Sequence, residues 1–152
     1  MDQFKLDIFS KEHCDVSRIG IKTLLNQQSR DIIIEMLSLL GIDKSIIASS
    51  AEFFESFEKT LQYRTQYGRD GVSRALLKDL LTNVGVVDSD LVYLIWSLEE
   101  NVDTIEAKNL FKYWEYIWYD ASDEALILYI EKKEVVLITD RGHIGSAFFV
   151  MT

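Results

Sequence analysis

The segment ALILYIEKKEVVLITDRG, residues 125–142, constrains the fold most, because only the charged residues EKKE separate its two apolar runs. Both runs are rich in β-branched and aliphatic residues, which favour strands, and the charged residues between them favour a turn. The pattern predicts a β-hairpin over residues 125–139. All six residues of the first run are apolar, so both faces of that strand are apolar. A strand of this kind is typically central in its sheet and covered on both sides.

Further strands are predicted near the two ends of the chain. Phe4, Leu6 and Ile8 alternate with polar residues, and this period of two predicts an N-terminal strand. After Arg141 and Gly142 a third short strand is expected over residues 144–151. The sequence therefore predicts a small, mainly antiparallel C-terminal sheet that the N-terminal strand joins.

Apolar residues at three- and four-residue steps predict a helical body ahead of the hairpin. Ser, Asp and Thr residues are available as helix caps, and Gly41 and Gly85 follow two of the predicted helices. The predicted helices cover residues 16–25, 29–40, 50–61, 73–84, 89–100 and 104–119. Helices and sheet together make an α+β fold of five to six helices. Because the chain shows no repeat and no linker, one domain over residues 1–152 is expected.

Negative charge is concentrated in one part of the chain. The formal net charge is −9, and residues 79–124 alone hold eleven acidic residues against two lysines. An acidic field of this kind repels nucleic acid and anionic membranes and attracts basic partners. The basic residues are scattered and not interleaved with the aromatic residues, so direct nucleic-acid binding is not expected. The simpler interpretation is that the charge only keeps the protein in solution.

The compartment is constrained by cysteine content and hydropathy. The chain has one cysteine, Cys14, so it cannot form an internal disulfide. No apolar run is long enough to span a bilayer, and the first residues lack the apolar core of a secretory signal. We therefore expect a cytoplasmic protein with no membrane contact, and secretion by a route without a cleaved signal is the alternative.

Residues with catalytic or metal-binding chemistry are few. His13 and Cys14 are sequence neighbours, and the side chains of neighbours generally point apart. Asp140 and His143 flank a two-residue turn, where they could form a general-base pair or two metal ligands, or simply a solvated turn. The sequence predicts a protein that is not an enzyme and has no cofactor and no metal, and an enzyme using Asp140 and His143 is the less favoured alternative.

The segment YWEYIWYDASDE, residues 113–124, places five aromatic rings within seven residues and three carboxylates in the five that follow. On a helical projection, Tyr116 and Tyr119 lie outside the apolar face. Tyrosine suits a protein interface, since it brings a large contact area and a polar tip at low entropy cost. The alternative is that the hairpin covers them. The face predicted as core comprises Leu110, Phe111, Tyr113, Trp114, Ile117 and Trp118.

The stretch WYDASDEALILYIEKKEVVLITDRGHI, an acidic turn followed by the apolar hairpin, resembles the immunity proteins of bacterial toxin–immunity systems, including contact-dependent inhibition. The resemblance implies a one-to-one inhibitor of a cognate toxin, often a basic nuclease whose surface is covered by acidic residues. In size, charge and α+β make-up the chain also resembles small acidic chaperones of secreted effectors, which are typically dimers. The predicted partner-binding residues are Glu99, Glu100, Asp103, Glu106, Tyr116, Tyr119, Asp120, Asp123 and Glu124.

Overall fold

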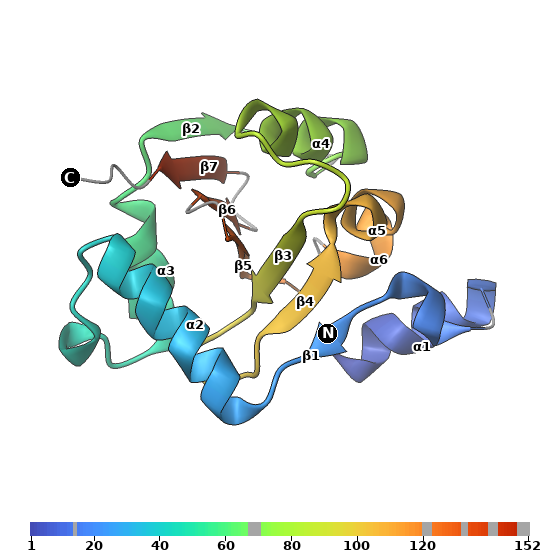
Figure 1. The fold of residues 1–152 in the computed structure, drawn as a ribbon, viewed down its shortest axis with the longest axis horizontal. Helices are drawn as coiled ribbons and strands as arrows, with labels where there is room; N and C mark the ends of the chain where they lie inside the picture. The colour runs from blue at the N-terminus through green and yellow to red at the C-terminus, as the bar shows by residue number, and fades with distance from the viewer. Residues whose placement is uncertain (14, 67–70, 120–122, 132–133, 140–142, 149–152) are drawn as a thin grey trace.

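A computed structural model shows a seven-stranded sheet with helices on both of its faces (Figure 1). The structure describes residues 1–13, 15–66, 71–119, 123–131, 134–139 and 143–148. Within these residues the strand order is β1-β4-β3-β5-β6-β7-β2, and every described pair is antiparallel. The strands are β1 (Lys22–Thr23), β2 (Tyr63–Gln66), β3 (Leu91–Ile95), β4 (Asp103–Glu106), β5 (Ala125–Ile130), β6 (Glu134–Thr139) and β7 (His143–Phe148).

The helices form two layers. Figure 1 shows α2 and α3 on one face of the sheet and α4, α5 and α6 on the other. The predicted α+β class is confirmed, and the sheet is larger than the predicted hairpin with its neighbours. The helices are α1 (Gln3–His13), α2 (Asn26–Leu39), α3 (Ser50–Glu58), α4 (Arg74–Asn83), α5 (Ala107–Lys112) and α6 (Trp114–Ile117), with 3-10 helices η1 (Val16–Ile19) and η2 (Lys44–Ile46).

The strand β5 is the centre of the fold. It pairs with β3 on one side and with β6 on the other, and all six of its residues are buried. Leu126, Leu128 and Ile130 join the core beneath α4, α5 and α6, whereas the alternate residues join the core beneath α2 and α3. Because successive side chains of a strand point to opposite faces, a strand apolar on both faces needs a cover on both. The predicted hairpin and its central position are both confirmed.

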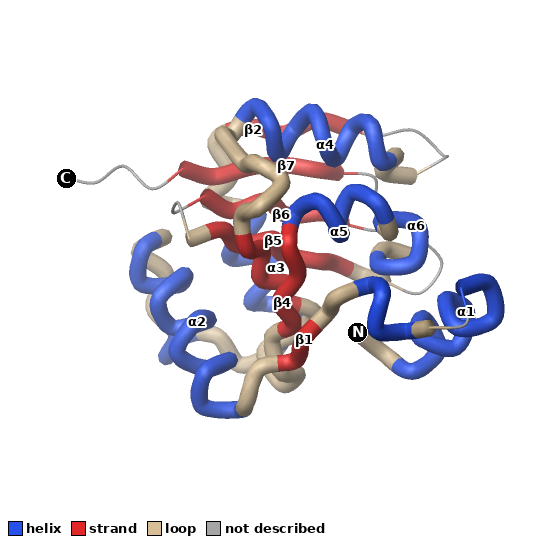
Figure 2. The backbone as a smooth tube through the Cα atoms, turned by 45° about the vertical axis from the view of Figure 1, so that its right-hand side comes forward, coloured by secondary structure: helices blue, strands red, loops and turns tan. Residues whose placement is uncertain are grey.

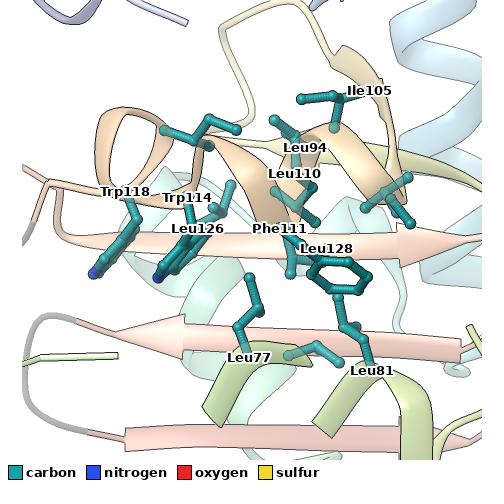
Figure 3. Close-up of a cluster of buried hydrophobic side chains, with 14 of the residues drawn as sticks. Leu77, Leu81, Leu94, Ile105, Leu110, Phe111, Trp114, Trp118, Leu126 and Leu128 are labelled. Carbon is teal, nitrogen blue, oxygen red and sulfur yellow. The ribbon is translucent and has the colours of Figure 1, made fainter. Parts of the chain in front are cut away.

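Residues 113–119, which we call the aromatic segment, supply much of the core on the α4–α6 side. Its rings Trp114 and Trp118 are stacked with centroids 6.2 Å apart, and Figure 3 shows them beside Leu77 and Leu126. All six residues that the helical projection predicts as core are buried, with exposed fractions of 0% to 7%. The projection succeeds although the helix is interrupted at Tyr113, where α5 ends and α6 begins.

The predicted N-terminal strand is wrong, because residues 3–13 form the helix α1. The Asp2 carboxylate caps this helix by accepting a hydrogen bond from the Lys5 backbone N–H at 2.9 Å. Lys5 and Phe9, four residues apart, face inward, whereas Phe4 is 53% exposed. The alternation of apolar residues that predicted a strand does not describe the buried side of this segment.

The predicted helix over residues 89–100 is also wrong, because residues 91–95 form β3. Asp90 closes a turn just ahead of this strand: its carboxylate accepts a hydrogen bond from the Val87 N–H, and its own N–H donates to the Val87 carbonyl, both at 2.9 Å. The run LVYLI has no polar interruption, so it lies in the sheet beside β5 with four of its five residues buried. The helix predicted from 104 begins three residues later, after β4.

For the remaining helices and strands, some predicted boundaries agree with the structure and others do not. The helices predicted over residues 50–61 and 73–84 are present as α3 and α4, with Ser49 and Ser73 as their caps. The helix predicted over 16–25 is η1 followed by β1, and the helix predicted from Ser29 begins at Asn26. The third C-terminal strand is present as β7, but its outer neighbour is β2 rather than an N-terminal strand. Among the described helices, none has both the length and the hydrophobicity needed to cross a bilayer.

The helix α1 packs at one end of the molecule, against α6 (Figure 2). Phe9 is fully buried there, and the centroid of its ring lies 5.2 Å from the ring centroids of Tyr113 and of Tyr116. These edge-to-face contacts attach a helix from the start of the chain to the aromatic segment near its end.

Candidate functional site

A groove lies between α1 and α6, and we call it the α1–α6 groove. Its volume is about 270 Å³ and most of its wall is apolar. Residues of both helices line it because Ile8 and Glu12 follow one another at a four-residue step on α1, while Tyr116 and Tyr119 project from the outer side of the aromatic segment. The residues that line it are Lys5, Ile8, Glu12, Glu115, Tyr116 and Tyr119.

The hydroxyl group of Tyr116 fixes one wall of this groove. It donates a short hydrogen bond to the Glu12 carboxylate and lies 3.1 Å from Nε2 of His13. Since the hydroxyl proton is given to Glu12, the His13 ring must present an N–H to the hydroxyl oxygen. The bond to Glu12, together with burial and the charge of Glu12, raises the pKa of the Tyr116 hydroxyl. Tyr116 is therefore held as a neutral donor in a fixed orientation.

An exposed pair of aromatic rings borders the groove. Phe4 is 53% exposed and Tyr119 is 41% exposed, and their rings meet edge to face with centroids 5.8 Å apart. Large apolar side chains that are exposed together indicate an interaction surface more strongly than single ones do.

A second hollow of about 280 Å³ lies next to the groove, and we call it the acidic hollow. Phe54 and Trp96 form the aromatic part of its wall. Lys5 lines both the groove and the hollow, so the two share one wall. The carboxylates that line the acidic hollow are those of Asp2, Glu100, Asp123 and Glu124.

Lys5 is buried at the boundary between the two hollows. Its ammonium group lies 2.7 Å from the Asp123 carboxylate and 3.8 Å from the centre of the Trp96 ring. The side chains of Lys5 and Asp123 are 3% and 8% exposed, so both partners are largely desolvated. The second oxygen of Asp123 accepts the Tyr119 backbone N–H at 2.7 Å, which fixes the end of the aromatic segment. A buried charge is retained only with such partners.

The structure brings several predicted site residues together. Tyr116 and Tyr119 line the groove, and Glu100, Asp123 and Glu124 line the acidic hollow. Glu99 lies close by, since its carboxylate accepts a hydrogen bond from the Ser50 hydroxyl at 2.5 Å and Ser50 also lines the hollow. That bond lowers the pKa of the Glu99 carboxyl, which stays ionised at neutral pH.

Two predicted site residues are placed elsewhere. Asp103 is 1% exposed, and it accepts hydrogen bonds from the Thr23 hydroxyl at 2.5 Å and from the Trp96 indole N–H at 3.0 Å. The Met1 amino group also contacts it. Asp103 is therefore an internal acceptor and not part of an exposed surface. Glu106 is exposed but lies at the far end of β4, where its carboxylate pairs with Lys108 at 2.6 Å.

Some residues fall outside what the structure describes. Asp120 and Asp140 are not among the described residues, and the side chain of His143 is not described either. The described residues contain no group of three or more His, Cys, Asp and Glu side chains that could hold a metal ion.

Sequence reasoning missed the contribution of α1 to the site. The alternation of apolar residues predicts a strand at Phe4, Lys5 and Ile8 and says nothing of Glu12, although all four line or border the groove. Asp2 as a helix cap, followed by Lys5 and Phe9 at a four-residue step, was the available signal.

Comparisons with protein-family models, with curated proteins and with solved structures found no match to this chain.

Proposed function

We propose that this chain is an immunity protein that binds and neutralises a basic toxin domain through the α1–α6 groove and the acidic hollow. The observation that carries the proposal is the exposed aromatic pair Phe4 and Tyr119 beside an apolar groove. Core packing does not account for this pair, and aromatic side chains in a carboxylate-rich setting are suited to anchor a basic partner.

The charge of the surface supports a basic partner. Together the two hollows are lined by six carboxylates and one ammonium group, that of Lys5, which Asp123 already pairs. At the groove rim Arg74 pairs with Glu115 at 2.5 Å, which compensates one further carboxylate. The remaining field is negative, so it accelerates association with a basic domain and disfavours an acidic one.

The test takes as its purified partner the C-terminal domain of the protein that the neighbouring upstream gene encodes. We expect a one-to-one complex whose association rate falls at least about tenfold between low and high salt. We also expect Tyr119→Ala to raise the dissociation rate by about thirtyfold, as for a central aromatic anchor.

The matched control is Ile34→Ala, which removes an exposed apolar side chain (48% exposed) from α2, a helix that lines neither the groove nor the hollow. It should leave both rates unchanged. A partner domain that does not bind, or an association rate indifferent to salt, would contradict the proposal. Cells that express the toxin domain should survive with the wild-type chain and be less protected by Tyr119→Ala.

A further inference from the structure

We propose that the occupant of this surface is one continuous basic segment of the partner, which places an apolar side chain in the α1–α6 groove and an arginine side chain in the acidic hollow. This inference rests on the proposed function for the partner being a protein. It adds which chemical groups the partner must present and where each one binds.

The groove selects an apolar group. Its wall is mostly apolar, with Ile8 on one side and the rings of Tyr116 and Tyr119 on the other. The hydroxyl group of Tyr116 is already bonded to Glu12 and close to His13, so it offers a guest little further hydrogen bonding. Burial of an aromatic or aliphatic side chain against these rings is the main favourable interaction that the groove can provide.

The acidic hollow selects a cation. Within the described part of the chain, no cation pairs with the carboxylates of Glu100 and Glu124, although both line this hollow. Phe54 and Trp96 supply an aromatic wall against which the stem of a long side chain can lie. Arginine fits this combination better than lysine, because its planar guanidinium group stacks on aromatic rings and binds carboxylates with two hydrogen bonds.

Lys5 shows within the molecule that this wall holds a cation. Its ammonium group is bound by the Trp96 ring face and by the Asp123 carboxylate, which are both residues of the acidic hollow. Both of these contacts are made inside the protein, so the positive charge of Lys5 is already compensated. The negative charge of Glu100 and Glu124 is therefore left for a cation supplied from outside.

The shared wall indicates that a single segment makes both contacts. Since Lys5 lines the groove and the hollow alike, a guest in one is adjacent to a guest in the other. Two side chains on one short stretch of backbone can enter both, and the second contact then forms at a high effective concentration. If two separate parts of the partner made these contacts, the groove and the hollow would not have to lie next to each other.

The probes are synthetic peptides with acetylated and amidated ends, in which arginine and phenylalanine are joined by glycine spacers of increasing length. A second series has glutamate in place of arginine. Binding is followed by two-dimensional NMR, with the Trp96 indole N–H reporting on the acidic hollow and the Tyr119 backbone N–H on the groove. The Trp114 indole N–H, which donates to the Val72 carbonyl in the core at 2.6 Å, is the internal control.

We expect the arginine peptides to shift the Trp96 and Tyr119 signals together and to leave the Trp114 signal in place. The glutamate peptides should bind at least about tenfold more weakly, since they bring a like charge to the carboxylates. The double variant Glu100→Gln/Glu124→Gln should reduce that preference to about twofold or less. Asp31→Asn, a change of the same kind on α2, which lines neither the groove nor the hollow, should keep the preference.

Equal affinity for the two peptide series overturns the inference, and so does a shift confined to Tyr119 at every spacer length. If the toxin domain binds the wild type and the double variant equally well, the inference is wrong and the proposed function stands. If the arginine peptides bind as expected but the toxin domain does not bind, the proposed function is wrong and the chemistry of the surface stands.

Discussion

Trp114 and Tyr119 lie five residues apart in one aromatic segment, yet the first ring is 1% exposed and the second is 41% exposed. The inner side of the segment stacks Trp114 on Trp118 against the leucines of α4 and β5 (Figure 3). The outer side places Tyr116 and Tyr119 in a groove with α1. Packing accounts for the inner rings completely, whereas the outer rings retain contact area that the fold itself does not use.

The largest effect that this comparison predicts is at Trp114. Replacing it with alanine removes a fully buried ring and its hydrogen bond to the Val72 carbonyl, so Trp114→Ala should lower the free energy of unfolding by about 3–5 kcal/mol. Urea denaturation followed by far-UV circular dichroism measures this. A loss below about 1 kcal/mol would mean that the inner side is not the core of this layer.

The next effect is at the base of the outer side, where Lys5 is buried. Lys5→Met keeps the volume but leaves the Asp123 carboxylate buried without its cation, which should cost about 3 kcal/mol of unfolding free energy. The matched control is the double variant Lys5→Met/Asp123→Asn, which removes both charges and should lose less. A double variant less stable than the single one would show that the ion pair does not act as a unit.

A smaller effect concerns the tyrosines of the opposite face, Tyr93 and Tyr129. Burial, with the Glu131 hydrogen bond for Tyr93 and the charge of Glu35 for Tyr129, raises the pKa of each hydroxyl from 10.0 to about 12. Between these values the unfolded chain has released protons that the folded chain still holds. Stability is therefore fully present below pH 10 and falls as the pH rises towards 12.

Denaturation midpoints measured across this alkaline range check that prediction. The double variant Tyr93→Phe/Tyr129→Phe should show a shallower decline than the wild type, since it lacks both hydroxyl groups. If stability falls equally steeply with pH in the wild type and in the double variant, other residues cause the alkaline loss of stability.

The smallest expected effect is on the stability contributed by the exposed pair. Phe4→Ala and Tyr119→Ala should each change the free energy of unfolding by only about 0.5 kcal/mol, because the two side chains keep 53% and 41% of their surface in water. A small stability change combined with a large loss of partner affinity would show that the outer rings serve binding whereas the inner rings serve stability. A loss comparable with that of Trp114→Ala would show that the outer rings are core residues after all.

The sequence predicted what depends on local patterning. The strand β5 was found because its six apolar residues admit no solvent face, and α3 and α4 because Ser49 and Ser73 each precede an amphipathic run. The prediction of which aromatic residues are buried is also confirmed. Buried side chains recur with the helical period even at Tyr113, where α5 ends and α6 begins.

The errors occur where tertiary contacts overrule local pattern. Residues 3–13 alternate weakly, but α1 forms because Phe9 packs on Tyr113 and Lys5 meets Asp123, partners more than a hundred positions away. Asp103 was assigned to the surface from its charge alone, and only the fold reveals that Thr23 and Trp96 surround it. Sequence reasoning found the acidic part of the site but overlooked the helix-cap signal for its α1 wall.

The pair formed by Lys5 and Asp123 joins residues 118 positions apart, and this separation has a kinetic consequence. Contacts between distant parts of a chain form late in folding, because the intervening loop must first be shortened by other structure. The β5–β6 hairpin can form from neighbouring residues, whereas the groove forms only when α1 packs against α6, which is distant from it in the sequence. A chain caught partway through folding would thus already have its central strands and still lack the surface by which we expect it to recognise a partner.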